Sequence, residues 1–234
     1  AVLSTIKQVD ISEYGEEHQA TITILMTETE KLLLEKTVES LEEKINTLAY
    51  EVDRFHIESG TGDLFYQRGI LVANKVYCLP SDFYPGESHL ARAGFEQMAS
   101  SAAEEGINLY DFSTFRSYGT QSGLYDRYVA ADGEAAANRY SAKPGCSEHQ
   151  TGLAIDIGGD NQSRWAEVTF DGTPEAEWLA NNAHRFGFIL RYPEGKEDIT
   201  GYMHESWHYR FVGDIAPRIK ESGISTLEEY LGLV

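Results

Sequence analysis

Residues 147–156 read SEHQTGLAID, and this stretch poses the central question of the sequence. Asp156 is flanked on both sides by isoleucine, in an apolar run that is typical of a buried strand. If the run is a strand, period-two alternation places Leu153, Ile155 and Ile157 on one face and Asp156 on the opposite face. A buried carboxylate without a partner is costly, so the sequence predicts a group that compensates Asp156.

A second run with two faces, HESWHYRF, occupies residues 204–211. Its aromatic residues alternate with polar ones, among them His208. Together with His149, the two predicted strands supply a His, Asp and His set that could hold zinc. Three protein ligands with water in the fourth position are typical of a catalytic zinc site. His204 lies four residues before His208, and spacing alone does not decide which of the two is the ligand.

Glu205 lies three residues before His208. Side chains three apart on a regular strand face opposite ways, so both can serve one site only if the strand bends between them. We therefore expect an irregularity at Ser206 or Trp207, with Glu205 close to the metal but not a ligand.

The two cysteines, Cys78 and Cys146, allow one disulfide at most. For so few cysteines two free thiols are the commoner state, which we expect here, with a single bridge as the alternative. Cys146 and His149 also have a C-x-x-H spacing that is compatible with zinc, but a second pair of this kind is missing. A packing role for Cys146 is therefore favoured.

The overall composition restricts the class of partner. The 234 residues suffice for one large or two modest domains with a stable core. The 38 acidic against 19 basic residues give a net charge of −19, which argues against nucleic acid or an anionic membrane surface. We expect no transmembrane segment, since no apolar run approaches the roughly 18 residues of a span. The chain begins AVLST without a signal peptide, so we expect a trimmed mature form or a fragment.

Residues 1–60 differ in character from the rest. We expect a strand at residues 20–26, ATITILM, and then a long helix capped by Thr27 or Thr29. Apolar residues in this helix follow a heptad pattern from Leu34 to Phe55, which is typical of a helix packed on the protein or of a coiled-coil stem that makes a dimer. We favour packing. The glycine-containing stretch at residues 58–63 is expected to be a linker.

From residue 66 onward, short apolar runs alternate with turn residues, and we expect one domain over residues 66–234. The pattern predicts a strand near residues 69–80, a helix that ends at Gly106, a strand or loop that carries Arg116 followed by a second helix, and a third helix that ends at Gly187 before another strand. This mixture of elements predicts an α+β fold.

These segments resemble a known family. SEHQTGLAID is similar to the S-x-H-x-x-G-x-A-x-D motif, and ESWH to the E-x-W-H motif, of the zinc D,D-carboxypeptidases related to vancomycin resistance. That group also includes L,D-carboxypeptidases, D,D-dipeptidases, phage endolysin peptidases and the hedgehog signalling domain. LVANKVYCLPSDFYP, FRSYGTQSGLY and LRYPEGKEDITGYMHESWHYRFVG resemble further family segments. The resemblance covers residues 69–234 and leaves residues 1–60 outside it.

The resemblance implies a small antiparallel sheet with helices packed around a single Zn²⁺ site. It implies that the zinc ligands are His149, Asp156 and His208. Glu205 matches the catalytic acid/base, and Arg116 matches the arginine that engages the substrate carbonyl.

Three further positions are implied, less directly, to contact the substrate: Ser117, Gln121 and Ser147. The implied function is a zinc-dependent D-alanyl-D-alanine carboxypeptidase that removes the C-terminal D-Ala from peptidoglycan stem peptides outside the cytoplasm, in the cell envelope or secreted. The alternatives are an L,D-carboxypeptidase on tetrapeptide stems and a noncatalytic zinc module that binds wall peptide or a protein. Intact Glu205 and Arg116 favour an enzyme.

Overall fold

The computed structural model describes residues 16–35 and 64–234. In chain order the elements are α2 (Glu16–Glu35), β1 (Tyr66–Gln67), β2 (Ile70–Leu71), α4 (His89–Glu104), β3 (Tyr110–Ser113), α5 (Tyr118–Asp132), α6 (Glu134–Tyr140), the 3-10 turn η1 (Glu148–Thr151), β4 (Ala154–Gly158), the 3-10 turns η2 (Gln162–Arg164) and η3 (Val168–Phe170), α7 (Pro174–Asn182), η4 (Ala183–Phe186), β5 (Phe188–Tyr192), α8 (Glu197–Thr200), β6 (Glu205–Phe211), η5 (Gly213–Ile215), α9 (Ala216–Ser222) and α10 (Leu227–Leu231).

The main sheet has four antiparallel strands in the order β3-β4-β6-β5, and β1 and β2 form a separate short pair. Helices and this small antiparallel sheet make up the α+β fold that the sequence predicts. In the β4–β6 pair, Asp156 lies directly opposite His208. The two runs that the sequence marks as anomalous are therefore neighbouring central strands.

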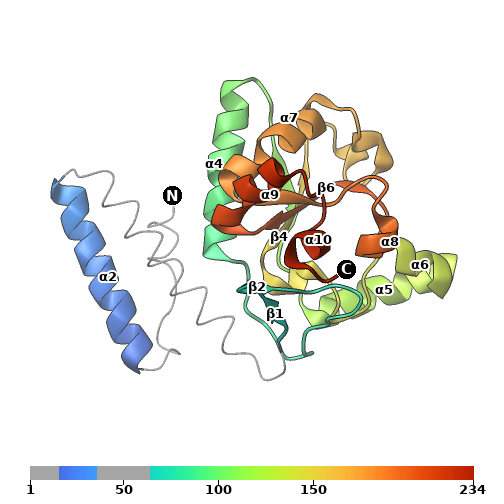
Figure 1. The fold of residues 1–234 in the computed structure, drawn as a ribbon, viewed down its shortest axis with the longest axis horizontal. Helices are drawn as coiled ribbons and strands as arrows, with labels where there is room; N and C mark the ends of the chain where they lie inside the picture. The colour runs from blue at the N-terminus through green and yellow to red at the C-terminus, as the bar shows by residue number, and fades with distance from the viewer. Residues whose placement is uncertain (1–15, 36–63) are drawn as a thin grey trace.

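One face of the sheet is covered by α4 and α7, which lie beside β4 and β6 in Figure 1. The principal core lies here, and Ile155 and Ile157 of β4 are fully buried in it. Leu153, Ile155 and Ile157 were expected on this apolar side, with Asp156 on the other. The alternation therefore places the carboxylate on the face away from the core, as the strand pattern predicts.

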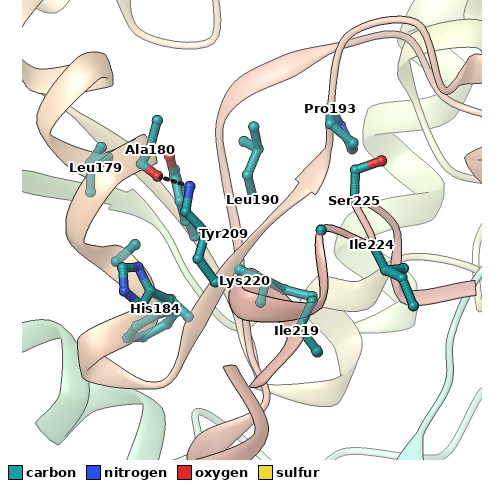
Figure 2. Close-up of a pocket in the computed structure, with 14 residues that line it drawn as sticks. Leu179, Ala180, His184, Leu190, Pro193, Tyr209, Ile219, Lys220, Ile224 and Ser225 are labelled. Carbon is teal, nitrogen blue, oxygen red and sulfur yellow. Dashed lines mark hydrogen bonds between the residues drawn. The ribbon is translucent and has the colours of Figure 1, made fainter. Parts of the chain in front are cut away.

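A pocket of about 300 Å³ lies between α7, α9 and the sheet, beside Tyr209 (Figure 2). Its walls are mostly apolar. Lys220 and Ala180 both line it, and Lys220 Nζ donates a hydrogen bond to the carbonyl of Ala180 at 3.0 Å. Adjacent side chains of a strand face opposite ways. Tyr209 therefore lies on the face of β6 that carries this pocket, and His208 lies on the opposite face.

Local capping signals set the helix boundaries. The Ser88 hydroxyl accepts a hydrogen bond from the Ala91 amide and begins α4, and Gly106 follows its end with a φ of +79°. Thr173 caps α7 in the same way, with Pro174 at its first turn. The helices expected before Gly106 and Gly187 are confirmed, although the last turn before Gly187 is the 3-10 segment η4.

The strand expected at residues 20–26 is wrong, because these residues lie within α2. The threonines that favour a strand are accommodated by helical hydrogen bonds: the hydroxyls of Thr23, Thr27 and Thr29 donate to the carbonyls four residues earlier. The helix also begins at Glu16, and not at Thr27 or Thr29.

The heptad pattern from Leu34 to Phe55 lies outside the described residues apart from its first member, which is in α2. The packing role, the stem and the dimer contact stay predictions, as does the division into residues 1–60 and 66–234. Leu64 and Phe65 do pack against the apolar clusters near β1 and β2. Within the described part of the chain, no helix has both the length and the apolar character that a bilayer span requires.

The expectation of two free thiols is wrong, because Cys78 and Cys146 form a disulfide. Their Cα atoms are 4.2 Å apart although 68 residues separate them in sequence. Beside the bridge, the Leu79 amide donates to the carbonyl of Gly145 at 2.7 Å, so the fold holds the two segments together. The disulfide also removes Cys146 as a metal ligand.

Candidate active site

His149, Asp156 and His208 come from η1, β4 and β6 and meet on the polar face of the sheet. All three are buried, and one nitrogen or oxygen atom from each lies within 4.8 Å of the others. The antiparallel pairing of β4 with β6 fixes two of them, and η1 delivers the third directly before β4. The structure therefore brings together the three predicted ligands.

The hydrogen bonds of these side chains leave two acceptor atoms facing one another. His149 Nδ1 lies 2.7 Å from the carbonyl of Thr114, which can only accept, so the ring proton sits on Nδ1. His149 Nε2 is then a bare acceptor, yet it lies 3.1 Å from Asp156 Oδ2, another acceptor. Burial lowers the pKa of His149, which favours this neutral ring. A cation between them would satisfy both facing acceptors, and two imidazoles with one carboxylate are a donor set suited to zinc.

Asp156 holds the two histidines together. Its Oδ1 lies 2.9 Å from His208 Nδ1. Burial alone would raise the pKa of Asp156, but the facing histidines outweigh it and hold this pKa well below its usual range. Burial likewise opposes the charge on His208, but the hydrogen bond to Asp156 and the nearby carboxylate of Glu148 raise the pKa of His208 to about 9. The cluster therefore favours positive charge at its centre.

Glu205 reaches this cluster through an irregularity in β6. Leu190 pairs with Tyr209 and Tyr192 with Glu205, so two steps along β5 span four steps along β6. The extra residues lie between Glu205 and Tyr209, which confirms the predicted break near Ser206 and Trp207. As a result Glu205 Oε2 lies 3.8 Å from His208 Nδ1. Burial raises the pKa of Glu205 to about 8.

Arg116 faces the same cluster from the segment after β3. Its Nη2 donates to Ser113 Oγ at 2.8 Å and lies 3.8 Å from Asp156 Oδ2, and its Nη1 donates to Gln121 Oε1 at 2.9 Å. A register shift in β3 between Asp111 and Ser113 aligns Ser113 with Asp156. These contacts fix a permanently charged fork beside the carboxylates.

The three residues expected at the substrate are placed differently. Ser147 lines the pocket of about 550 Å³ that contains the cluster. Ser117 caps α5 by accepting from the Thr120 amide, and Gln121 is buried between Arg116 and the carbonyl of Ala142. Gln121 thus supports Arg116, and the contact of Ser117, Gln121 and Ser147 with substrate stays a prediction.

His204, the alternative ligand, is directed elsewhere. Its Nδ1 lies 2.8 Å from the carbonyl of Tyr192 and its Nε2 3.2 Å from Asp171 Oδ1. The ring of Tyr192 instead stacks on His208, with ring centres 4.9 Å apart.

Sequence reasoning missed several residues of the pocket wall: Tyr192, Tyr202 and Trp207. Aromatic residues next to the ESWH motif give no separate signal, because the same alternation equally describes an apolar core. It also missed Glu148, which lies inside the quoted motif and is discussed below.

A buried His, Asp and His set that could hold a metal ion, a carboxyl beside it and a fixed arginine are together suited to metal-assisted hydrolysis. Comparison with known proteins agrees. The profile of the D-alanyl-D-alanine carboxypeptidase family, VanY, matches residues 87–214. A D-alanyl-D-alanine carboxypeptidase of Enterococcus faecalis (strain ATCC 700802 / V583) is 46% identical over 105 residues, which are 44% of this chain and 37% of that protein.

Two solved structures are similar in fold and sequence. The LD-carboxypeptidase LdcB is 46% identical, with a TM-score of 0.66, over 74% of this chain and 93% of that chain. A mutant of the D,D-pentapeptidase VanY from a VanB-type resistance cassette, solved in complex with Zn(II), is 33% identical, with a TM-score of 0.60, over 68% of this chain and 97% of that chain.

The aligned part of the chain spans between 37% and 67% of the length of the curated relatives that it matches. The family profile nevertheless includes the whole His, Asp and His cluster, Glu205 and Arg116. The chain belongs to the D-alanyl-D-alanine carboxypeptidase family, VanY.

Proposed function

We propose that the protein is a zinc-dependent carboxypeptidase that releases the C-terminal D-Ala of peptidoglycan stem peptides, with D,D specificity. The observation that carries the proposal is the buried cluster of His149, Asp156 and His208 with Glu205 beside it. Family membership and the D,D activity named for the Enterococcus faecalis relative support the substrate. Stem peptides lie outside the cytoplasm, so we propose that the enzyme acts in the cell envelope or after secretion.

In this proposal His149, Asp156 and His208 hold one zinc ion. When bound, the ion acts as a Lewis acid that lowers the pKa of water and polarises a carbonyl. Asp156 balances part of its charge and keeps both imidazoles directed to one point. The bare Nε2 of His149 supports this assignment.

Glu205 moves the proton. Its ionised carboxylate takes a proton from the attacking water, and the raised pKa of about 8 helps the carboxyl to hold this proton until it delivers it to the nitrogen of the departing D-Ala. Burial supplies this property, because it disfavours the charged form of the carboxyl. The 3.8 Å separation from His208 Nδ1 keeps Glu205 next to the ligands.

Arg116 stabilises the negative charge that develops on the scissile carbonyl oxygen. Ser113 and Gln121 hold its guanidinium in place, so little ordering is required when substrate binds. Ser147 contacts the peptide from the pocket wall. Ser117 and Gln121 lie on the side of the terminal carboxylate and help to bind it.

A second candidate is an L,D-carboxypeptidase that acts on tetrapeptide stems. The similarity to LdcB favours it, because that match has higher sequence identity and a higher TM-score than the match to VanY. Both candidates release D-Ala with the same zinc, Glu205 and Arg116, and they differ in the residue that precedes the scissile bond.

Incubation of the zinc-loaded protein with a pentapeptide and a tetrapeptide stem, followed by mass spectrometry, tests the proposal. Loss of one D-Ala from the pentapeptide supports D,D specificity, and loss from the tetrapeptide alone supports the second candidate. A protein that binds both peptides and cleaves neither is a binding module, which would refute both.

A further inference from the structure

Four buried charged side chains lie behind His208, and the proposed mechanism does not use them. Each is at most 3% exposed, and they come from η1, β5, β6 and α10: Glu148, Arg191, Arg210 and Glu228. Two carboxylates and two guanidiniums make the cluster formally neutral. Burial of four charges is costly even when they are paired, so such a cluster is weak evidence for a purely stabilising role.

The two carboxylates of the cluster differ in which of their oxygens accept hydrogen bonds. Glu228 is saturated, because its two oxygens accept from Arg191 Nη1 at 2.8 Å and Nη2 at 2.6 Å, and Oε1 also accepts from Asn74 at 3.1 Å. Glu148 accepts through Oε1 alone, from Arg191 Nε at 2.8 Å and Arg210 Nη1 at 2.9 Å. The two arginines therefore fix the carboxylate plane of Glu148 while its second oxygen stays available.

That second oxygen faces His208. Glu148 Oε2 and His208 Nε2 are both buried, and neither has a hydrogen-bond partner among the described residues. They lie 3.6 Å apart, slightly beyond a hydrogen bond, in an ion-pair contact. Two buried polar atoms that each lack a partner and face one another are best satisfied by one shared proton, which only the imidazole can supply.

We propose that Glu148 is a positioning residue that keeps the ring proton of His208 on Nε2 and so leaves Nδ1 free to bind the metal. This inference rests on the proposed function, in which His208 is a zinc ligand. The partner of the second nitrogen of a ligating histidine sets its tautomer and ring orientation. Arg191 and Arg210 act one step further out, since they orient Glu148.

A glutamine at position 148 cannot perform both tasks. Its single carbonyl oxygen would be drawn to the two arginine donors, which would direct its NH₂ group at His208 Nε2. A donor would then face the atom that must itself donate, and the tautomer with the proton on Nδ1 would be favoured. Glu148→Gln therefore opposes metal binding through a change in proton position.

The experiment compares the full chain with Glu148→Gln and Glu228→Gln, using zinc and a competing chromophoric chelator. Both substitutions remove one buried charge from the same cluster, but Glu228 does not contact His208. We expect Glu148→Gln to bind zinc roughly tenfold to a hundredfold more weakly than Glu228→Gln, as for other outer partners of metal ligands. Equal affinities of the two variants would overturn the proposal.

A second measurement does not depend on the folding of any variant. In the zinc-loaded parent protein with ¹⁵N-labelled histidine, NMR should show His208 with a metal-bound Nδ1 and a protonated Nε2. Zinc bound through Nε2 would overturn the proposal. A parent protein that binds no zinc would refute both the role of Glu148 and the zinc site. A parent protein that binds zinc through Nδ1 of His208 but does not cleave the peptides would refute the proposed function alone.

Discussion

Glu205→Gln separates proton transfer from metal binding. The amide has nearly the shape of the carboxyl and fits the same buried position, which is 8% exposed in the parent protein. Glu205 is not among the three grouped candidate ligands, so we expect zinc content and peptide binding to be unchanged. Turnover should fall, because an amide cannot accept the proton of the attacking water.

The size of this loss follows from the surroundings of Glu205. Removal of a general base costs roughly a hundredfold to ten-thousandfold, or about 2.7 to 5.5 kcal/mol of the barrier. We expect the upper part of this range, because the neighbouring carboxylates are already engaged. Asp156 faces both histidines, and Glu148 is held by two arginines.

The assay is single-turnover cleavage of D-Ala-terminated stem peptides followed by mass spectrometry, with zinc measured by elemental analysis on the same samples. Glu96→Gln, which changes an exposed carboxylate on α4, is the matched control and should keep the parent rate. A Glu205→Gln protein that holds zinc and cleaves at the parent rate would refute the role assigned to Glu205.

Three further outcomes are expected. Arg116→Ala should lower kcat/KM by roughly a hundredfold to a thousandfold, with the urea midpoint of unfolding nearly unchanged. In metal-free protein the pKa values of Glu205 and His208 are raised to about 8 and about 9, so the native protein keeps protons that the unfolded chain releases. The stabilisation from these two groups is complete at low pH and is lost as the pH rises. The free energy of unfolding, measured in urea, should therefore fall between about pH 5 and 9. Replacement of Cys78 and Cys146 by serine, which opens a link across 68 residues, should lower the free energy of unfolding by about 4 kcal/mol, and an unchanged urea midpoint would contradict this.

The central part of the fold could be predicted because its signals are local. Alternation alone separates Asp156 from Ile155 and Ile157, and the capping residue Ser88 and the terminal Gly106 bracket α4. The break in β6 was also predictable, since Glu205 and His208 cannot share a face of a regular strand.

The features that sequence reasoning missed depend on contacts between distant segments. The Cys78–Cys146 bridge depends on how two segments approach, which spacing does not encode. Glu148 looks like an ordinary surface glutamate until Arg191 of β5 and Arg210 of β6 fold over it. The error in α2 has a different cause, because β-branched residues indicate a strand only where a sheet is present to receive them.

The pairing of β4 with β6 also bears on the order of events during folding. Asp156 and His208 are 52 residues apart in sequence, so their contact requires closure of a long loop and belongs to the slow, non-local part of folding. No short segment of the chain carries all three candidate ligands. Metal uptake during refolding would therefore report completion of the sheet, and its rate should follow the slowest folding phase and not the helix signal that precedes it.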